Sequence, residues 1–324
     1  MPTSPSTMKA KSPTRKTKAR KIPSALTLTL PGTSANLGPA FDAAALAFDL
    51  NFQITAKPAK EYSIRARGRD TAICSQLEDN LIVKTYEDLL RAHGCNVLPL
   101  SFRIQNNIPI GKGCGSSAAA RLAGIAFAVH FGQLGWGDAE IIAEASRLEH
   151  HPDNAAACWL GGIAVARMTD DCVQAVKIVP KGKWPLLLAV PEEKLSTEAA
   201  RRVLPASYSR EDAVANIQNS MLLLTAFTQG RRDLLANALK DRIHQPYRAP
   251  LCPLLPALQG LGGQGGILGV ALSGAGPSVL MFLDPRIPVA QIRKRVSACL
   301  KDKGLSAELL STAIASRGTI RSRG

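Results

Sequence analysis

Two kinds of feature that would restrict the function are missing from this sequence. No stretch approaches about 18 consecutive apolar residues, so no membrane-spanning helix is predicted. The seven cysteines are scattered, odd in number and include no C-x-x-C pair, a pattern that excludes a disulfide framework and a zinc site of the usual spacing. We therefore expect reduced thiols in a cytoplasmic protein.

Acidic residues are missing from the first 21 positions, although this segment holds seven lysines and arginines. It also contains prolines and almost no large apolar residue, so it cannot bury enough surface to fold. Residues 1–23 are therefore predicted to be a disordered basic arm. We interpret the arm as a solvated tail, with a targeting peptide and a nucleic-acid tether as alternatives. Subtracting its seven charges from the net charge of +15 leaves +8, which suits polyanionic ligands.

Neither the Walker-type phosphate loop nor the dinucleotide fingerprint G-x-G-x-x-G occurs. The chain instead has NNIPIGKGCGSSAAA at residues 106–120. Gly111, Gly113 and Gly115 permit a backbone whose amides converge on an anion, and the helix predicted to follow would add its positive N-terminus. Ser117 can present its hydroxyl to a phosphate or its magnesium ion, and Lys112 can add a charge. From this stretch alone, an ordinary glycine-rich turn is an equally good interpretation.

Strand and helix patterns are mixed along the chain without strict alternation, which predicts an α+β fold. Residues 25–30 alternate as in a strand and run into a turn predicted at Pro31-Gly32. The turn-rich residues 181–185 are the predicted domain boundary, and a helix is predicted over residues 233–243. The remaining predicted strands are 46–55, 62–66, 98–105, 161–168, 186–190, 269–272, 279–283 and 307–310, and the remaining helices are 80–92, 116–130, 139–148, 213–228 and 289–301.

Three stretches together resemble one family of small-molecule kinases. They are PGTSANLGPAFDAAALAF at 31–48, IPIGKGCGSSAAA at 108–120 and LSGAGPSVLMF at 272–282. In order and separation they resemble the motifs of the GHMP kinases, which are named for galactokinase, homoserine kinase, mevalonate kinase and phosphomevalonate kinase. The resemblance extends over nearly everything from Leu26 onward.

The resemblance implies a two-domain α+β fold. Residues 24–180 would form a nucleotide-binding domain like domain 2 of ribosomal protein S5, and residues 181–324 a ferredoxin-like C-terminal domain. The nucleotide would lie in the cleft between them. The implied activity is transfer of the γ-phosphate of ATP, with Mg²⁺, to the hydroxyl of a small alcohol.

Three further stretches resemble the branch of the family that acts on L-homoserine, which makes O-phospho-L-homoserine on the route to threonine. They are LEHHPDNAAACWLGG at 148–162, STEAARRVLP at 196–205 and DRIHQPYRAPLCP at 241–253. Two positions depart from the pattern. Cys114 stands where the family usually has Leu or Met, a harmless apolar change. His150 replaces a glycine, a change that can alter the backbone beside the metal site.

The resemblance also implies which residues hold the substrate. Arg201 and Arg248 would bind a carboxylate, for which a guanidinium offers a bidentate fork. Asp42 would hold the ammonium, with Asn36 at the same polar end. His151 and Asn154 would line the pocket, and Asp153 would orient its neighbours or act nearby. A surface salt bridge is the alternative for the arginines, a turn for the Asn36–Asp42 segment and a structural role for His151.

The remaining predicted site residues hold the nucleotide and its metal. Glu149 would share Mg²⁺ with Ser117, since this ion prefers one or two carboxylates together with phosphate and water oxygens. For Asn80, contact with the nucleoside and a helix N-cap are nearly equal alternatives. The predicted nucleotide contacts are Asn80, Pro109, Ile110, Gly111, Lys112, Gly113, Cys114, Gly115, Ser116, Ser117, Ala118, Ala119 and Thr197.

We expect no dedicated catalytic base, because phosphoryl transfer through a loose transition state depends mainly on positioning and charge stabilisation. The substrate hydroxyl would attack the γ-phosphate in line. The alternatives are a related kinase for another alcohol, such as mevalonate or shikimate, and a non-catalytic ligand-binding protein. A homodimer is expected by analogy; a nucleic-acid partner and a membrane are not.

Overall fold

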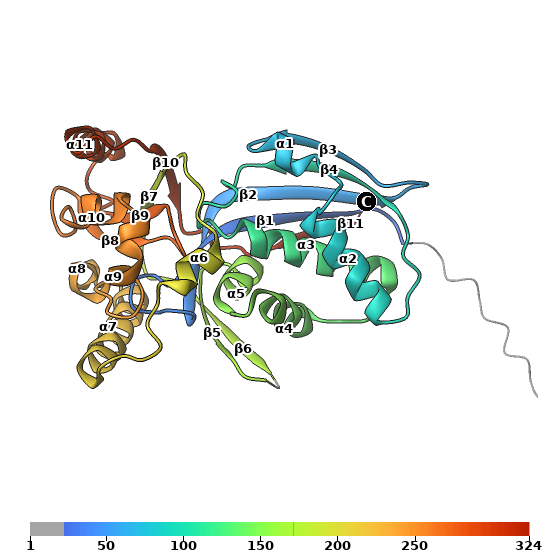
Figure 1. The fold of residues 1–324 in the computed structure, drawn as a ribbon, viewed down its shortest axis with the longest axis horizontal. Helices are drawn as coiled ribbons and strands as arrows, with labels where there is room; N and C mark the ends of the chain where they lie inside the picture. The colour runs from blue at the N-terminus through green and yellow to red at the C-terminus, as the bar shows by residue number, and fades with distance from the viewer. Residues whose placement is uncertain (1–22, 171, 324) are drawn as a thin grey trace, which may run out of the picture.

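The computed structural model describes residues 23–170 and 172–323 as two mixed layers built around two β-sheets (Figure 1). The predicted basic arm lies outside the described residues except for its last position. The larger sheet and its helices form one half of the molecule, and the smaller sheet with its helices forms the other. The short helix α6 (Thr197–Arg202) lies between the two halves in Figure 1.

The larger sheet has the strand order β11-β1-β2-β4-β3, and β2 also pairs with β5, which pairs with β6. Only β3 and β4 are parallel. The predicted alternation in the first strand is confirmed, because Leu26, Leu28 and Leu30 are at most 4% exposed. The strands are β1 (Leu26–Ala35), β2 (Ala44–Pro58), β3 (Ser63–Gly68), β4 (Leu100–Asn106), β5 (Ile163–Met168), β6 (Val173–Ile178) and β11 (Ile320–Arg323).

The turn predicted at Pro31-Gly32 was wrong, because β1 continues through both residues to Ala35. The register with β2 shifts between them, so the strand carries a bulge there instead of a turn. A Cβ atom on Gly32 would lie 2.3 Å from Cε2 of Phe48. The glycine therefore permits the close approach of an aromatic ring on the neighbouring strand.

Helices α2 to α5 lie on one side of the larger sheet (Figure 1). Small residues let α2 and α3 pack closely: a Cβ on Gly124 would lie 2.7 Å from the carbonyl oxygen of Ile82. This packing agrees with the predicted buried helix after the glycine-rich loop. The helices of this half are α1 (Thr71–Cys74), α2 (Leu81–Ala92), α3 (Ser116–Gly132), α4 (Asp138–Glu149) and α5 (Asp153–Leu160).

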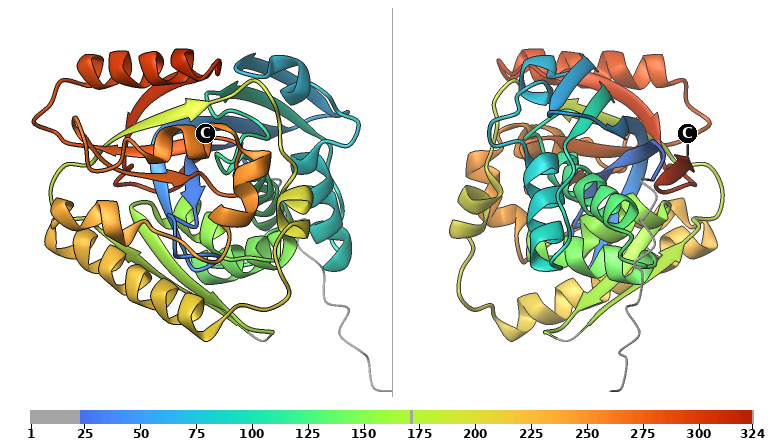
Figure 2. Two further views of the ribbon diagram at one scale, coloured as in Figure 1. Left: turned by 60° about the vertical axis from the view of Figure 1, so that its left-hand side comes forward. Right: turned by 90° about the vertical axis from the view of Figure 1, so that its right-hand side faces the viewer.

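The smaller sheet has the antiparallel strand order β10-β7-β9-β8, which is the order of a ferredoxin-like fold. Buried residues of α10 and α11 pack on one of its faces, and those of α7 pack on the other. Figure 2 shows α7 and α11 on opposite sides of this sheet. The elements are β7 (Pro185–Val190), α7 (Arg210–Gln229), η1 (Arg232–Leu234), α8 (Leu235–Ala238), α9 (Gln245–Arg248), η2 (Ala249–Leu251), α10 (Leu254–Gln259), β8 (Ile267–Leu272), β9 (Val279–Leu283), α11 (Val289–Asp302) and β10 (Glu308–Ala313).

The helix predicted over residues 233–243 was also wrong beyond its first turns, because α8 ends at Ala238. The carboxylate of Asp241 accepts hydrogen bonds from the backbone N–H groups of Ile243, His244 and Gln245 at 2.9, 2.9 and 2.6 Å. An aspartate that satisfies several nearby amides favours a turn over a continuous helix. The turn delivers the chain into α9.

The C-terminal segment returns to the larger sheet. The N–H of Ala315 donates to the carbonyl oxygen of Ala47 at 2.9 Å, and β11 pairs with β1. The predicted division into residues 24–180 and 181–324 did not anticipate that the last strand would belong to the first sheet. The two halves are thus tied together by the end of the chain.

The sequence predicts no membrane-spanning helix and no disulfide framework. None of the helices within the described residues is long and apolar enough to cross a membrane. All seven cysteines are described and all are free thiols, in agreement with the absence of a disulfide framework.

Candidate functional site

A cavity of about 110 Å³ lies where the glycine-rich loop, the turn after β1, the junction of α4 with α5, helix α6 and the SGAGPS turn at 273–278 converge. It brings together segments far apart in the sequence, from both halves of the molecule. The predicted site residues that line it are Asn36, Asp42, Gly111, Gly113, Cys114, Gly115, Ser116, Ser117, Ala118, Glu149, His151, Asn154, Thr197, Arg201 and Arg248.

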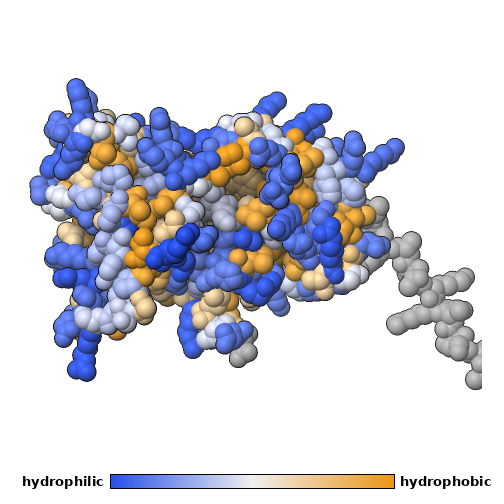
Figure 3. Space-filling view, viewed as in Figure 1, coloured by the Kyte–Doolittle hydropathy of each residue, from blue (hydrophilic) through white to orange (hydrophobic). Residues whose placement is uncertain are grey.

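A second cavity of about 390 Å³ adjoins the first and shares Gly111, Ser116 and Ser117 with it. The space-filling view shows a hollow with apolar side chains around it near the middle of one face (Figure 3). A cavity of this size and character suits a heteroaromatic base. Its apolar walls include Phe52, Ile73, Leu81, Ile82, Ile104 and Ile108, and the predicted residues Asn80, Ile110 and Ala119 also line it.

The glycine-rich loop has the alternating backbone of an anion-binding nest. Gly111, Gly113 and Gly115 have φ angles of 71°, 75° and 73°. Alternation of left- and right-handed residues turns successive N–H groups toward one side of the chain. Helix α3 begins directly after Gly115, so its N-terminal dipole reinforces the positive potential on that side.

Four carbonyl oxygens of this loop accept hydrogen bonds from residues outside it. Those of residues 111, 112, 113 and 114 accept hydrogen bonds from Leu195 N, Ser278 N, Ser273 Oγ and Thr33 N at 3.4, 3.4, 2.7 and 3.1 Å. The C=O of one residue and the N–H of the next belong to the same peptide group and point in opposite directions. The N–H groups of residues 112 to 115 therefore point away from the groups that donate to these carbonyl oxygens. The loop is therefore fixed by contacts from both halves of the molecule.

The structure does not place the Lys112 ammonium at the cavity. Its Nζ donates to the carbonyl oxygens of Glu192 and Glu193, the second at 2.6 Å, and the side chain lines neither cavity. Burial, followed by the charge of Lys194, lowers the pKa of Lys112. These two hydrogen bonds connect Lys112 of the glycine-rich loop to the segment before α6. Pro109 also lies outside both cavity walls.

Glu149, the last residue of α4, and Ser117, in the first turn of α3, meet at the cavity. The Ser117 hydroxyl donates to Oε1 of Glu149 at 2.7 Å, and Nε of Arg121 donates to the same oxygen at 2.5 Å. Oε2 takes part in neither bond. One carboxylate and one hydroxyl beside an anion-binding loop form the hard oxygen donor set that Mg²⁺ prefers, so these residues fit that ion.

His150 stands at a position that is glycine in the kinases that the sequence resembles. It caps α4 with φ 64° and ψ 17°, the left-handed conformation that glycine adopts most readily. The histidine therefore leaves the local turn between Glu149 and His151 intact. The conformation costs on the order of 1 kcal/mol for a residue with a side chain.

Asp42 and Arg201 are paired with each other. The Arg201 guanidinium donates three hydrogen bonds of 2.8 to 3.0 Å to the two carboxylate oxygens of Asp42. The side chain of Arg201 is 36% exposed and that of Asp42 is 30% exposed, so the pair lies at the mouth of the cavity and not in the core. The anion and the cation predicted to hold a zwitterion thus neutralise one another in this structure.

Arg248 is only 1% exposed and its guanidinium is firmly held. It donates to the carbonyl oxygens of Ala200 and Gly274 at 2.9 and 3.4 Å and to Nδ1 of His244 at 3.2 Å. Since Nδ1 of His244 accepts this bond, Nε2 carries the proton and donates to Gly38 O at 2.8 Å. Burial lowers the pKa of His244, in agreement with this neutral tautomer.

Phe41 contacts both arginines, although it was not predicted as a site residue. The guanidinium carbons of Arg201 and Arg248 lie 5.5 and 5.3 Å from the centroid of its ring. Burial and then the charge of Arg201 lower the pKa of Arg248, so the two cations repel one another. A ring quadrupole close to both guanidiniums offsets part of this repulsion. The adjacency of Phe41 to Asp42 was the only signal in the sequence.

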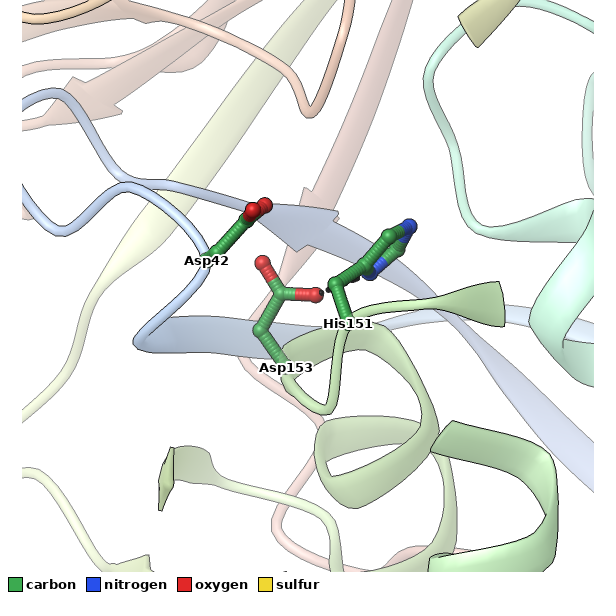
Figure 4. Close-up of side chains that lie close together, drawn as sticks. All are labelled: Asp42, His151 and Asp153. Atoms are coloured by element: carbon green, nitrogen blue, oxygen red, sulfur yellow. Dashed lines mark hydrogen bonds and ion pairs between the residues drawn. The ribbon is translucent and has the colours of Figure 1, made fainter. Parts of the chain in front are cut away.

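His151 and Asp153 form a buried pair. Nδ1 of His151 donates to Oδ1 of Asp153 at 2.7 Å. Burial by itself would lower the pKa of His151, but the hydrogen bond and charge of Asp153, with the charges of Asp42 and Glu149, raise it above its ordinary value. Figure 4 shows the two carboxylates of Asp42 and Asp153 facing one another beside this ring.

The side chains of the three predicted asparagines form hydrogen bonds within the protein. Nδ2 of Asn36 donates to Gly274 O at 2.9 Å, and its Oδ1 accepts from the N–H of Asp42 at 3.0 Å. Oδ1 of Asn154 accepts from the Thr33 hydroxyl at 2.6 Å. Oδ1 of Asn80 caps α2, and its Nδ2 donates to Gln76 O at 2.8 Å, so the helix-cap alternative describes its side chain.

Two protein-family models match segments of the chain that line these cavities. The model for the N-terminal domain of GHMP kinases matches residues 80–162, and the model for the C-terminal part of GHMP kinases matches residues 223–302. Together these ranges include the glycine-rich loop, Glu149 and the SGAGPS turn.

Individual proteins match over nearly the whole chain. A homoserine kinase of Solibacter usitatus is 40% identical over 292 residues, 90% of this chain and 95% of that protein. A homoserine kinase of Synechocystis sp. is 37% identical over 87% of this chain and 93% of its own length. The crystal structure of homoserine kinase from Cytophaga hutchinsonii has the same fold, with a TM-score of 0.76, 21% identity and coverage of 95% and 100% of the two chains.

Proposed function

This chain belongs to the GHMP kinase family, and from that we propose that it transfers the γ-phosphate of ATP to the hydroxyl group of L-homoserine. The observation that carries the proposal is the meeting of an anion-binding loop with Asp42, Arg201 and Arg248 in one cavity. Relatives of matching length that are named homoserine kinase support the choice of substrate. The product would be O-phospho-L-homoserine.

Each of the two cavities would bind a different part of the nucleotide. The apolar cavity would take the adenine base, and the loop amides with the N-terminus of α3 would hold the phosphates. Glu149 and Ser117 would hold Mg²⁺, which, when bound, neutralises charge on the phosphates. The amides are fixed before the ligand arrives, so little reorganisation is needed as charge develops on the transferred group.

The other end of the cavity would bind the amino acid. The guanidiniums of Arg201 and Arg248 would bind its carboxylate, and Asp42 would bind its ammonium group. Its hydroxyl would then attack the γ-phosphorus in line while the bond to the ADP oxygen breaks, and the hydroxyl proton would leave to a phosphate oxygen or to water. No dedicated base is proposed, because phosphoryl transfer through a loose transition state depends mainly on positioning and charge stabilisation.

The function is tested with the purified protein, ATP and Mg²⁺, by measuring ADP release with homoserine, mevalonate or shikimate. We expect turnover with homoserine and little or none with the two substrates that lack an ammonium group. Preferred turnover of mevalonate or shikimate would assign the chain to another substrate. Failure to release ADP with all three would favour a non-catalytic ligand-binding protein.

Replacing Phe41 with leucine should raise the KM for homoserine about tenfold, because two cation–π contacts are lost. The KM for ATP should not change, since the ring contacts Arg201 and Arg248, which are proposed to bind the amino acid. Phe41→Tyr keeps the ring and should retain a KM close to that of the wild type. Equal KM values for homoserine in Phe41→Leu and the wild type would show that the ring does not position the arginines.

A further inference from the structure

One buried oxygen at the cavity lacks a partner among the residues that the structure describes. Within them, Oδ2 of Asp153 makes no hydrogen bond, although the residue is only 1% exposed. The other carboxylate oxygen accepts from His151 Nδ1 and from the N–H of Asn154, both at 2.7 Å. Leaving a buried charged oxygen unsatisfied is costly, so a native carboxylate in this position is expected to have a partner that the described chain does not supply.

The direction of this oxygen indicates where such a partner would lie. In Figure 4, Oδ2 of Asp153 points toward the carboxylate of Asp42 and away from His151. One oxygen from each aspartate and one ring nitrogen of His151 lie within 4.8 Å of one another, and all three residues line the cavity. Two carboxylates so close together repel unless a cation lies between them.

A substrate ammonium group fits this arrangement well. It donates hydrogen bonds in up to three directions, so it can bridge an oxygen of each aspartate. Asp42 already holds a cationic nitrogen group, the guanidinium of Arg201. Within the described residues, the guanidinium of Arg201 donates its hydrogen bonds to Asp42 alone.

We propose that Asp153 is the second carboxylate of the ammonium subsite, and that Arg201 leaves Asp42 when a zwitterion binds. The proposal rests on the proposed function. Arg201 turns to the substrate carboxylate beside Arg248, while the ammonium replaces it at Asp42 and reaches Oδ2 of Asp153. The ion pair between Arg201 and Asp42 is thus replaced by an ion pair from each of these two residues to the ligand.

This exchange makes the site selective for ligands that carry both charges. A ligand without an ammonium would draw Arg201 to its carboxylate and leave Asp42 without its cation. A ligand without a carboxylate would compete with Arg201 for Asp42 while supplying nothing to Arg201. In both cases a charged group at the cavity loses its partner, which opposes binding.

Asp153→Asn tests the proposal, because the amide oxygen can still accept from His151 and Asn154 while the charge is removed. Binding to the full-length protein is measured by calorimetry with homoserine and with 4-hydroxybutanoate, which is homoserine without its ammonium. The dissociation constant for homoserine should rise about 10- to 100-fold, the loss expected for a hydrogen bond to a charged group. That for 4-hydroxybutanoate should change less than about twofold. Asp138→Asn, which alters the first residue of α4 as Asp153→Asn alters that of α5, is the matched control and should change neither.

Three outcomes would overturn the inference. An equal loss for both ligands would mean that Asp153 acts only by orienting His151. Unchanged homoserine affinity with abolished turnover would make Asp153 a catalytic base. Homoserine binding to the wild type that is lost in EDTA and restored by Mg²⁺ would place a metal ion between the aspartates.

A crystal structure of the wild-type complex with homoserine gives a second measurement if the variant does not fold. The amino nitrogen should lie within hydrogen-bond distance of Oδ2 of Asp153, and Arg201 should have left Asp42. An amino nitrogen beyond that distance would refute the proposal. If the wild type neither binds nor phosphorylates homoserine, the proposed function fails, and this is distinct from failure of the subsite.

Discussion

Replacing Gly113 with alanine is expected to lower kcat/KM by at least about 100-fold, since a displacement of about 1 Å in a catalytic site can cost that much. A Cβ atom at this position would lie 2.2 Å from Ser273 O and 2.7 Å from Gly276 O. Both are backbone atoms of the SGAGPS turn, so no side-chain rotation can relieve the overlap. The loop must move away from the turn, and its amides move with it.

Gly135→Ala is the matched control for this prediction. Gly135 has φ 76° against 75° for Gly113, but no atom of the described residues lies within 4 Å of the position its Cβ would take. Both variants therefore bear the strain of a left-handed alanine, about 1 to 2 kcal/mol. Only Gly113→Ala also displaces the loop. The measurements are kcat/KM for ATP and the thermal midpoint of each variant.

If Gly113→Ala and Gly135→Ala lost equal stability and kept equal activity, the contact between loop and turn would not be needed for phosphate binding. A loss of activity in Gly113→Ala alone would instead show that the second half of the molecule holds the loop in its active shape. Three of the four hydrogen bonds to the loop carbonyls come from the second half of the molecule, so we expect the second result.

Local patterns in the sequence predicted most strands and the longer helices, because these elements have either a periodic buried face or a continuous run of apolar residues. The leucines of β1 alternate with threonines, and α3 is dense in small apolar residues. The errors fall where a local signal has two meanings. Pro31-Gly32 is a common turn pair, but here the glycine admits the ring of Phe48 within a strand. Two short strands, β6 and β11, were not predicted, and β11 exists only through pairing with β1.

The arrangement of the site was less predictable, because its contacts join residues far apart in the chain. Asp42 and Arg201 were assigned separate roles, and spacing could not show that they pair across 159 positions. The unpaired oxygen of Asp153 follows from burial, which only packing determines. Lys112 has a suitable charge beside the glycines, yet the backbone carbonyls of residues 192 and 193 draw it away.

Glu149→Gln should reduce kcat by about 100- to 1000-fold at a fixed Mg²⁺ concentration, the loss typical when a single preorganised charge contact to the transferring group is removed. The amide keeps an oxygen that can accept from Ser117 and Arg121, so the local bonds can persist while the negative charge disappears. The Mg²⁺ concentration needed for half-maximal activity should rise, because the only carboxylate assigned to the ion is gone. The KM for homoserine should change little.

Glu144→Gln separates this effect from a general loss of charge on α4. Glu144 lies on the same helix and is paired with Arg147, but it does not line the cavity. Its variant should retain wild-type kcat and the wild-type Mg²⁺ dependence. If Glu149→Gln kept the wild-type Mg²⁺ dependence and lost only stability, Glu149 would be a structural partner of Arg121. The ion would then be held by the phosphates and Ser117 without a carboxylate from the protein.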